Sequence, residues 1–466
     1  MFTNLDKQKN IRIFTMEDYF NENGEPFTEQ IRKMFPAEKD LPPVTREITM
    51  IAPLKMKIPA FFSAATCLTP YASRLRFRYT FDAGDSACLL QLYLVARQAG
   101  GKSFARMIYN VVLERIIRRD NEQRAIEKEY NEEKARSRKT DKLPKPPKTT
   151  VMLLPVSTSI AKLVQRCDAP VRHYGQKIIL LMFSEELALS IESSKRSYAN
   201  LQSILRTAYD LDSLYGVDYL SDSSYSAVVD ILLSTFFCTT PNTLHEYFGK
   251  RALEGGNLTR SVLIDLDTQL GDEPPVFKEL TAKQLERISE ITDKMFDTIF
   301  NADGSIKPTI QVDMKWLNAD VKRWCSAKNT EAVKSGSISL GTFFKRASTS
   351  AFRIAALSQY LYSLEGKTCR QQVRKIYYAC AEVILYYMLK FFDEEFEQLH
   401  STSANTGKTR KSLFNAMPEI FTKDMLLTKM QELGKRSPAN VIISQWKNFG
   451  WIVDTEKDSY KKTGKK

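Results

Sequence analysis

The chain has 466 residues and a formal net charge of +13 at pH 7. Hydrophobic residues make up 43% of it and charged residues 26%, a balance that excludes a disordered chain and predicts two or three globular domains. The excess of positive charge favours a polyanionic partner, above all a nucleic acid. An equally good alternative is a soluble protein that is basic but has no such partner.

The cysteines, histidines and apolar stretches exclude several classes of protein. None of the seven cysteines belongs to a Cys-x-x-Cys pair, so we expect buried thiols in a reducing compartment, the cytoplasm. With only three histidines, far apart in the sequence, a His-built metal site or a Ser-His-Asp triad is not expected. The most apolar stretch, 377–392, is interrupted by Glu382 and Lys390, so we predict a core helix and no membrane partner.

Residues 1–80 form an N-terminal region. The prolines of residues 36–43 predict a loop, residues 58–65 have a helical pattern, and residues 77–81 alternate as a strand does. We therefore expect this region to supply helices and one strand ahead of the next domain.

Residues 81–270 alternate short apolar runs with helical patterns. Five such runs predict an α/β core in which a parallel sheet is covered by helices. The runs lie at 89–95, 151–154, 178–183, 231–237 and 262–266.

A charged helical insert, 116–148, separates the first two runs. Opposite charges four residues apart, as in Lys128 with Glu132 and Glu132 with Arg136, predict a solvated helix. The prolines near its end stop any helix. A projection that faces DNA or another subunit is the alternative.

The segment 96–103, Ala-Arg-Gln-Ala-Gly-Gly-Lys-Ser, follows the first run and precedes a helical pattern. A buried strand, a tight loop and a helix N-terminus form the context of a phosphate-binding P-loop. Gly100 and Gly101 allow the backbone to approach ATP closely, Lys102 would reach its β- and γ-phosphates, and the Ser103 hydroxyl would bind Mg²⁺. The alternative is a Gly-Gly turn before an ordinary helix.

One position departs from the P-loop pattern. Ala96 stands where the leading glycine of the motif is expected. Because alanine does not adopt a positive φ freely, the backbone must differ there or the loop must bind less well.

An ATPase also needs an acidic group near the phosphates, and the third run supplies candidates. An ordinary Walker B strand ends in Asp-Glu, whereas this run continues as Ser184-Glu185-Glu186. Glu185 is therefore the candidate that orients the attacking water, with Glu186 in reserve. The alternative is an acidic helix start, which the helix dipole favours in any protein.

Two further residues could act on the γ-phosphate. The fourth run ends at Thr239-Thr240-Pro241, so Thr240 could sense this phosphate, or could simply form a Thr-Pro turn. Gly255-Gly256 precedes Arg260 and could present it to a neighbouring subunit. Such an arginine finger contributes about 10³–10⁵ in rate and would require an oligomer; a surface arginine after a turn is the alternative.

Residues 271–400 are predicted to be a helical lid domain, with helices at 280–300, 313–327, 340–364 and 370–400. Arg346 and Arg353 are about two turns apart and share a face, so either could fold over the phosphates as a second sensor. A salt-bridged helix face is the alternative. The polar segment 401–409 is predicted to be a linker.

Residues 411–466 form a small terminal unit. Two helices followed by a strand give the outline of a winged helix-turn-helix, with Ser437 capping the second helix and Trp446 in the core. Residues 460–466 are a basic tail. The expected apolar positions are Leu413, Phe414, Met417, Phe421 and Met425.

From about residue 60 to about residue 455 the chain resembles the helicase-like family of mobile-element proteins common in Bacteroidales, which is related to the ATPase part of phage and plasmid primase-helicases. Each shared motif is short, and their order carries the resemblance. The motifs are Gly101-Lys102-Ser103, the charged segment through Asp120, Arg124 and Tyr130, Ser184-Glu185, the segment 205–210, Asp218-Tyr219, Thr240-Pro241, Glu254-Gly255-Gly256 with Arg260, and Arg346 with Phe352-Arg353.

The resemblance implies a RecA/AAA+-like P-loop core that hydrolyses ATP with Mg²⁺. It implies a ring of identical subunits that translocates on or unwinds single-stranded or forked DNA while a mobile element replicates, with a primase as a possible partner. Ala96, Leu187 and Thr239 depart from the family pattern. The altered motifs at Ala96, Ser184 and Leu187 favour the alternative of a DNA-binding replication or loading factor with a degenerate P-loop. A third possibility is a structural protein without either activity.

Overall fold

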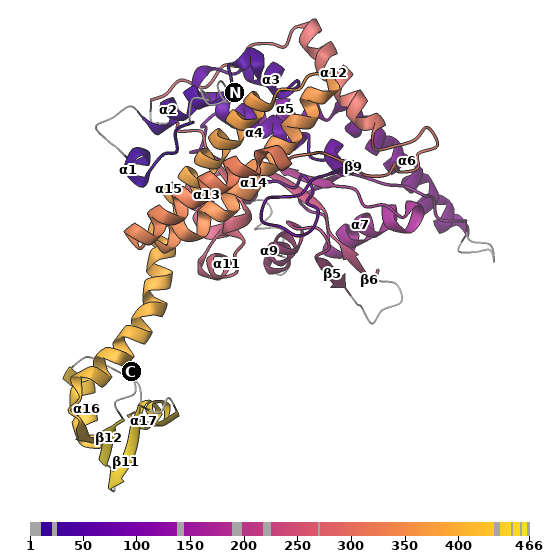
Figure 1. The fold of residues 1–466 in the computed structure, drawn as a ribbon. Coiled ribbons are helices and arrows are strands. Elements are labelled where there is room, and N and C mark those ends of the chain that lie inside the picture. The colour runs from indigo at the N-terminus through magenta and orange to yellow at the C-terminus, as the bar shows by residue number, and fades with distance from the viewer. Residues whose placement is uncertain are drawn as a thin grey trace, which may run out of the picture. The chain divides into compact units, whose positions relative to one another are not determined.

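The computed structural model of the chain describes residues 11–463, except 21–25, 138–143, 189–197, 218–224, 269–270, 433–438, 449–450 and 457–458. The chain divides into two compact units, Met1–Asp393 and Glu394–Lys466 (Figure 1). The first unit contains the N-terminal region, the sheet and most of the helical region.

The five predicted apolar runs form one parallel sheet, which confirms the mixed α/β class. The spatial order is β3-β4-β7-β2-β8. Nearly every strand residue is buried, as expected of a parallel sheet covered on both faces. The strands are β2 (Gln91–Val95), β3 (Leu153–Pro155), β4 (Leu180–Ser184), β7 (Leu233–Thr239) and β8 (Val262–Asp265).

The strand order creates a place for a ligand. The chain leaves β2 toward the β3 edge of the sheet, whereas it leaves β7 in the opposite direction, across β2 to β8. Parallel strands have their carboxyl ends at one edge, and the loops that leave β2 and β7 in opposite directions open a crevice there.

Two buried helices fix the position of the strand ends. α4 (Lys57–Cys67) packs against β2 and β7, and α5 (Phe104–Val112) packs against α4. The sequence of α4 is almost wholly apolar or small, and its buried hydroxyls are satisfied within the helix, as Ser63 donates to the Pro59 carbonyl at 2.7 Å. In Figure 1, α4 and α5 lie in the upper part of the first unit and α7 (Ile160–Tyr174) in its lower part.

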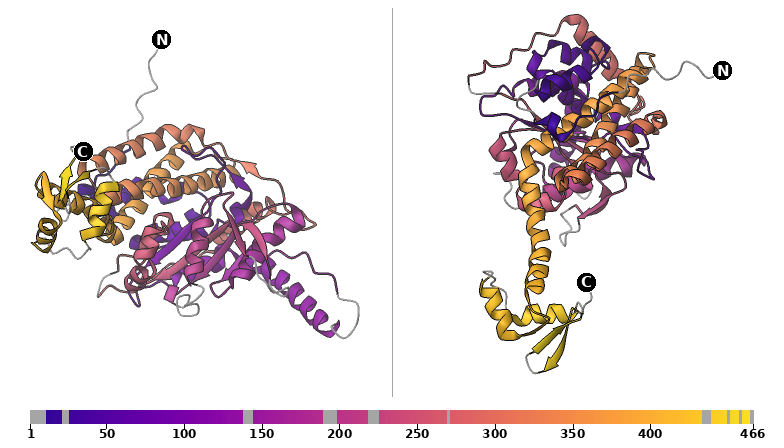
Figure 2. Two further views of the ribbon diagram at one scale, coloured as in Figure 1. Left: turned by 90° about the horizontal axis from the view of Figure 1, so that it is seen from below. Right: turned by 60° about the vertical axis from the view of Figure 1, so that its left-hand side comes forward.

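The charged insert begins as the helix α6 (Glu114–Ser137), as predicted. Lys128 and Arg136 each lie 3.9 Å from Glu132 on its exposed surface. Its base is anchored because the buried Asp120 carboxylate accepts the backbone N–H groups of Met152 and Leu153, at 2.9 and 2.7 Å. Figure 2 shows the end of α6 projecting away from the rest of the unit.

The predicted strand at 77–81 is wrong. The two-residue strand β1 (Leu75–Arg76) pairs with β9 (Ile310–Gln311), and Phe77 adds only an isolated bridge. Phe77 and Tyr79 instead pack against Phe352, with ring centroids 6.0 and 5.2 Å apart. Side-chain burial, rather than a ladder of hydrogen bonds, holds this segment.

Long helices form the last part of the first unit. They are α12 (Ala282–Asp297), α13 (Asn318–Ser335), α14 (Ile338–Leu364) and the start of α15 (Arg370–Ala416), which continues into the second unit. α13 begins five residues later than predicted because residues Lys315–Leu317 form a 3₁₀ turn. The predicted linker at 401–409 is wrong, since α15 continues through it; the segment has no proline, and one glycine costs a helix only about 1 kcal/mol.

The apolar stretch of α15 is buried, as predicted. Glu382, which interrupts it, forms an ion pair with Lys328 of α13 at 3.0 Å, and both side chains are completely buried. The same lysine donates to the Phe14 carbonyl at 2.6 Å, which ties the N-terminal segment to both helices. Among the described residues, no helix has the length and apolarity needed to cross a membrane.

Arg46 of α3 (Thr45–Ile51) binds Glu365 at the end of α14, and this pair makes stability depend on pH. Burial raises the pKa of Glu365, but hydrogen bonds from Arg46 and Lys367 outweigh it and lower the pKa from 4.5 to about 2. A depressed carboxyl pKa stabilises the fold above pH 4.5, and this contribution disappears as the pH falls toward 2.

When the pH falls from 5 to 3, we therefore expect the free energy of unfolding of the parent to decrease by about 1 kcal/mol more than that of Glu365→Gln. This value is reduced for solvent screening. Urea unfolding at the two pH values measures this difference. Glu286→Gln, an exposed residue of α12, is the control and should follow the parent. Parallel losses in the parent and in Glu365→Gln would contradict the assignment.

The second unit has its own core around Trp446, as predicted. The Trp446 side chain is 1% exposed, and its ring lies 5.1 Å from Phe414 and 5.9 Å from Phe421. The elements after α15 are β10 (Ile420–Thr422), α16 (Lys423–Glu432), α17 (Ala439–Asn448), β11 (Ile452–Glu456) and β12 (Ser459–Lys462), and the sheet is antiparallel in the order β10-β12-β11.

Two expectations for this unit need correction. Met425 is 45% exposed, because α16 turns Leu426 and Met430 to the core instead. The predicted tail begins as strand β12, since Tyr460 is buried against Phe421. Ser437, the expected helix cap, lies outside the described residues.

Candidate functional site

The segment 96–103 connects β2 directly to α5, so the strand, loop and helix expected of a P-loop are in place. Ala96 is buried and its N–H donates to the Thr239 carbonyl at 3.0 Å. The left-handed positions are Ala99, with φ 57°, and Gly101, with φ 75°. Ala96 has no positive φ, so the backbone differs there from the motif, which is the first of the two expected outcomes; the strain falls on Ala99, where it costs roughly 1–2 kcal/mol.

Lys102 lies at the carboxyl ends of β2 and β7. Its ammonium nitrogen is 3.4 Å from the Ala96 carbonyl oxygen and 3.3 Å from the Thr239 carbonyl oxygen, at the ends of these two strands. Burial lowers the pKa of Lys102, and the nearby Cys238 and Glu186 offset part of this decrease. Both hydrogen bonds are long, so a phosphate at the loop could replace them with shorter bonds to an anion.

A segment after β8 lies against the loop. A Cβ built on Gly101 would be 2.3 Å from the Pro275 ring, and one on Gly100 would be 2.9 Å from the Thr268 hydroxyl oxygen. The Phe277 ring stacks on Phe104, the first residue of α5, at 4.8 Å. Both glycines are therefore required by close contacts as well as by the expected approach of a phosphate.

Glu185 lies at the end of β4 and is paired with a residue of α5. Its carboxylate is 3.0 Å from the Arg106 guanidinium, and both side chains are 46% exposed. The guanidinium of Arg106 also lies 4.5 Å from the centre of the Phe183 ring. Ser184, at the Walker B Asp position, donates to the Glu186 carbonyl at 2.8 Å and so forms a turn. Arg106 was not predicted from the sequence; its signal is its position in the first turn of α5, four residues after Lys102.

Thr240 follows β7 at the same edge of the sheet. Its hydroxyl oxygen accepts the Thr243 N–H at 3.3 Å and caps α10 (Pro241–Tyr247). These contacts agree with the alternative of a Thr-Pro turn, which here begins α10. Sensing of the γ-phosphate by Thr240 stays a prediction.

The three predicted arginines lie at the other edge of the sheet. Arg353 donates to the Leu89 carbonyl at 3.1 Å, two residues before β2 begins, and Arg260 ends the 3₁₀ turn that precedes β8. At about 3.3 Å per strand residue, this edge is about 20 Å from the phosphate loop. The expectation that Arg346 and Arg353 fold over phosphates in the same chain is therefore corrected by their positions.

These arginines surround Tyr209. The guanidinium carbons of Arg353, Arg346 and Arg260 lie 3.9, 5.4 and 5.8 Å from the centre of its ring. Asp210 is the shared acid, 3.3 Å from Arg353 and 3.9 Å from Arg346, so the predicted common face of α14 is the salt-bridged one. Burial lowers the pKa of Arg260. Its guanidinium donates to the Gly256 carbonyl of the preceding loop at 3.0 Å.

A group that was not predicted from the sequence lies at the end of β8, beside the loop 96–103. Asp265 pairs in register with Val95, and Lys390 lies 2.9 Å from Asp265 and 2.6 Å from Asp267. Tyr387 donates to Asp267 at 2.8 Å. The available signal was the same as for Glu185, a carboxylate at the end of an apolar run.

The residues present fit Mg²⁺ bound together with a nucleotide. Ser103 precedes α5 without capping it, so its hydroxyl oxygen is not used for a cap, and Glu185 and Glu186 supply oxygen ligands at the same edge. In the described part of the chain, no three His, Cys, Asp or Glu side chains are grouped to hold a metal alone. Phosphate oxygens would have to complete the ligand set.

No known family model matches the sequence, and the search of curated proteins finds no match. The assignment of a function therefore depends on the geometry of the site.

Proposed function

We propose that this chain is a P-loop ATPase with a RecA/AAA+-like core that acts on DNA as a helicase or translocase in the replication of a mobile genetic element. The observation that carries the proposal is the position of Lys102, whose ammonium group lies over the ends of two adjacent parallel strands and at the start of α5. A helix N-terminus and a lysine at a strand crevice together favour a phosphate ligand.

Each residue at this edge has a part in the proposed reaction. The backbone N–H groups of the loop and Lys102 bind the β- and γ-phosphates, and Ser103 binds Mg²⁺. Glu185 would release Arg106 and orient the attacking water. Arg106, freed in the same step, is close enough to the loop to face the phosphates. Thr240, at the end of β7, would contact the γ-phosphate.

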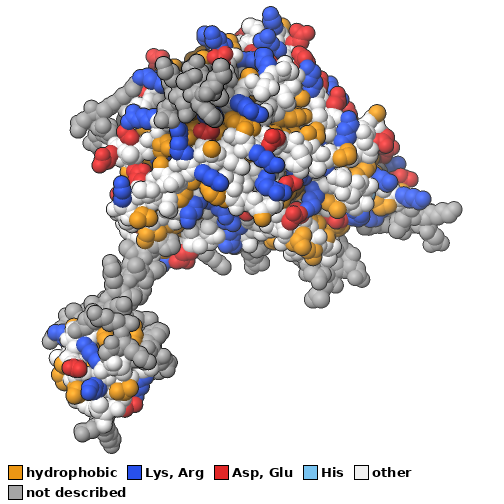
Figure 3. Space-filling model, viewed as in Figure 1, with side chains coloured by type: hydrophobic (Ala, Val, Ile, Leu, Met, Phe, Trp, Pro, Cys, Tyr) orange, Lys and Arg blue, Asp and Glu red, His pale blue; other side chains and the backbone are white. Residues whose placement is uncertain are grey.

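The second unit supports DNA as the partner. The order of its elements, the end of α15, then β10, α16, α17, β11 and β12, is that of a winged helix-turn-helix in which α17 would enter a groove. Lys and Arg outnumber Asp and Glu from residue 411 to the last residue. On the face shown in Figure 3, Lys and Arg side chains are spread over the first unit as well. We expect DNA affinity to fall steeply with salt.

The test of this proposal is ATP turnover by the full chain, with and without single-stranded DNA. We expect turnover that DNA stimulates and that Lys102→Ala removes. Absence of turnover under both conditions would overturn the ATPase proposal. A ring assembly and a primase partner remain predictions of the resemblance, and an Arg260 that acts across subunits remains a prediction of the sequence pattern.

A second candidate is a DNA-binding replication or loading factor whose loop does not hydrolyse ATP. The contact of Pro275 with Gly101, the Glu185–Arg106 pair and Ser184 at the Asp position favour it. This candidate predicts salt-dependent DNA binding that survives Lys102→Ala, with no turnover.

A further inference from the structure

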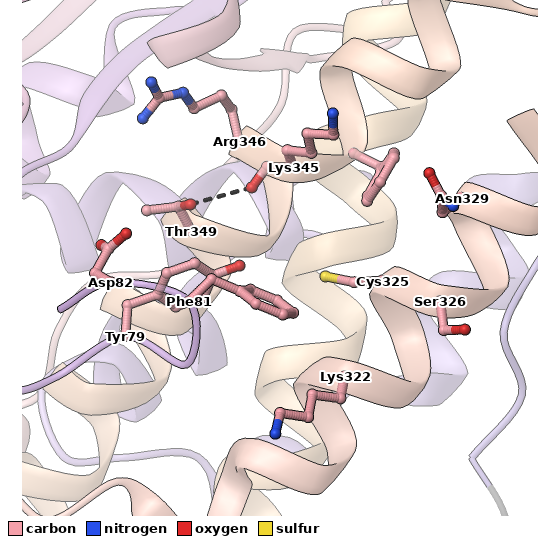
Figure 4. A pocket seen from close by; sticks show the side chains of 11 residues that line it. Tyr79, Phe81, Asp82, Lys322, Cys325, Ser326, Asn329, Lys345, Arg346 and Thr349 are labelled. Carbon is pink, nitrogen blue, oxygen red and sulfur yellow. Dashed lines mark hydrogen bonds between the residues drawn. The ribbon is translucent and has the colours of Figure 1, made fainter.

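A cavity of about 600 Å³ lies between α13, α14 and the loop that follows β1 (Figure 4). Its volume is in the range of pockets that hold small ligands, about 300–1,000 Å³. Thr349 in its wall is one turn before Arg353, which contacts Leu89 at the edge of the sheet opposite the phosphate loop. The cavity is therefore separate from the candidate ATP site.

Positive side chains line the cavity at both ends. Figure 4 shows Lys322 at one end and Lys345 and Arg346 at the other. Asp82 is the single acid in the lining. Lys322 and Lys345 are exposed, and neither forms an ion pair within the described residues, whereas Arg346 shares Asp210. An anionic ligand would neutralise this surplus of positive charge.

Aromatic rings lie between the two charged ends. Phe81 is 57% exposed and packs edge-on against Tyr79, with ring centroids 5.7 Å apart. An exposed phenylalanine in a loop offers a face on which a planar base can stack. Ser326 and Asn329 also line the cavity, and their side-chain polar groups have no hydrogen-bond partner among the described residues. They are available to the edge of such a base.

We propose that this cavity binds a nucleoside phosphate, whose base stacks on Phe81 and whose phosphate meets one of the two lysines, Lys322 or Lys345; a nucleotide within a strand meets both. Ser326 and Asn329 bind the base edge. The ligand is either a free nucleotide or one nucleotide of a single strand, which carries phosphates on both sides of its base. The inference does not depend on ATP hydrolysis, because the cavity and the phosphate loop are at opposite edges of the sheet.

The test uses the full chain with Lys102→Ala, so that the phosphate loop does not contribute to binding. The probes are 2-aminopurine deoxyriboside monophosphate and a 12-residue oligothymidylate with one central 2-aminopurine, whose fluorescence is quenched on stacking. We expect saturable quenching that Phe81→Ala weakens about tenfold. The double variant Lys322→Ala/Lys345→Ala should lower the salt dependence of oligonucleotide binding by about one ion for each lysine.

Lys334→Ala is the matched control, since Lys334 is an exposed lysine of α13 that does not line the cavity. Quenching of both probes would identify a free nucleotide as a sufficient ligand, and quenching of the oligonucleotide alone would identify a strand. No quenching of either probe, or titrations of the Phe81 and lysine variants that match the parent, would overturn the proposal. Either failure leaves the ATP turnover test unaffected, so the two proposals fail separately.

Discussion

Replacing Glu382 with alanine is expected to lower the free energy of unfolding by about 3–5 kcal/mol. The Glu382 carboxylate is fully buried and accepts the indole N–H of Trp324 at 2.8 Å and the backbone N–H of Phe14 at 3.2 Å. It also accepts the Tyr19 hydroxyl. Its removal leaves the ammonium of Lys328 buried without a countercharge, which costs far more than the loss of one surface ion pair.

Urea unfolding followed by far-UV circular dichroism and tryptophan fluorescence measures this loss. Glu394→Ala, an exposed carboxylate on the same helix, is the control and should change stability by less than about 0.5 kcal/mol. If the alanine variant does not fold, Glu382→Gln gives a measurable, smaller loss. The double variant Lys328→Met/Glu382→Leu should recover only part of the loss, the part caused by the buried charge without a countercharge, because the donors of Trp324, Phe14 and Tyr19 still lack an acceptor. A Glu382→Ala protein as stable as the parent would contradict this account.

Lys102→Ala is expected to weaken binding of ATP and Mg²⁺ by about 10- to 150-fold, the loss of one hydrogen bond to a charged group. Among the described residues, the ammonium group makes two long bonds, of 3.3 and 3.4 Å, both to backbone carbonyls, so the fold should be unaffected. Calorimetric titration with ATP measures the affinity, and an unfolding curve that matches the parent confirms the fold.

The matched control for this experiment is Lys128→Ala, an exposed lysine of α6 that should bind ATP as the parent does. Unchanged ATP affinity in Lys102→Ala would remove the phosphate-loop assignment. DNA binding measured on the same protein then decides whether the second candidate function remains.

The sequence predicted the elements whose pattern is local. Each strand of the sheet is an apolar run followed by a helical pattern, and parallel strands buried on both faces leave this signature in any fold. Lys102 and Glu185 were assigned to the same edge because both follow such runs, and the structure places them there. The polar segment of α15 was missed because polar composition alone does not break a helix.

Positions that depend on long-range packing could not be predicted in this way. Arg346 and Arg353 were correctly assigned to one face of α14, yet only the packing of that helix shows that this face meets Tyr209 at the edge opposite the phosphate loop. Arg106, Lys390 and the cavity beside Phe81 join segments far apart in the chain.

The sequence by itself determined the parallel α/β core and the strand, loop and helix around Lys102, because strand burial and helix periodicity are recorded in neighbouring residues. Only the tertiary structure decided which charged groups share an edge of the sheet with Lys102. Those contacts join residues of large sequence separation, and they arise from how the helices pack on the sheet rather than from any local pattern.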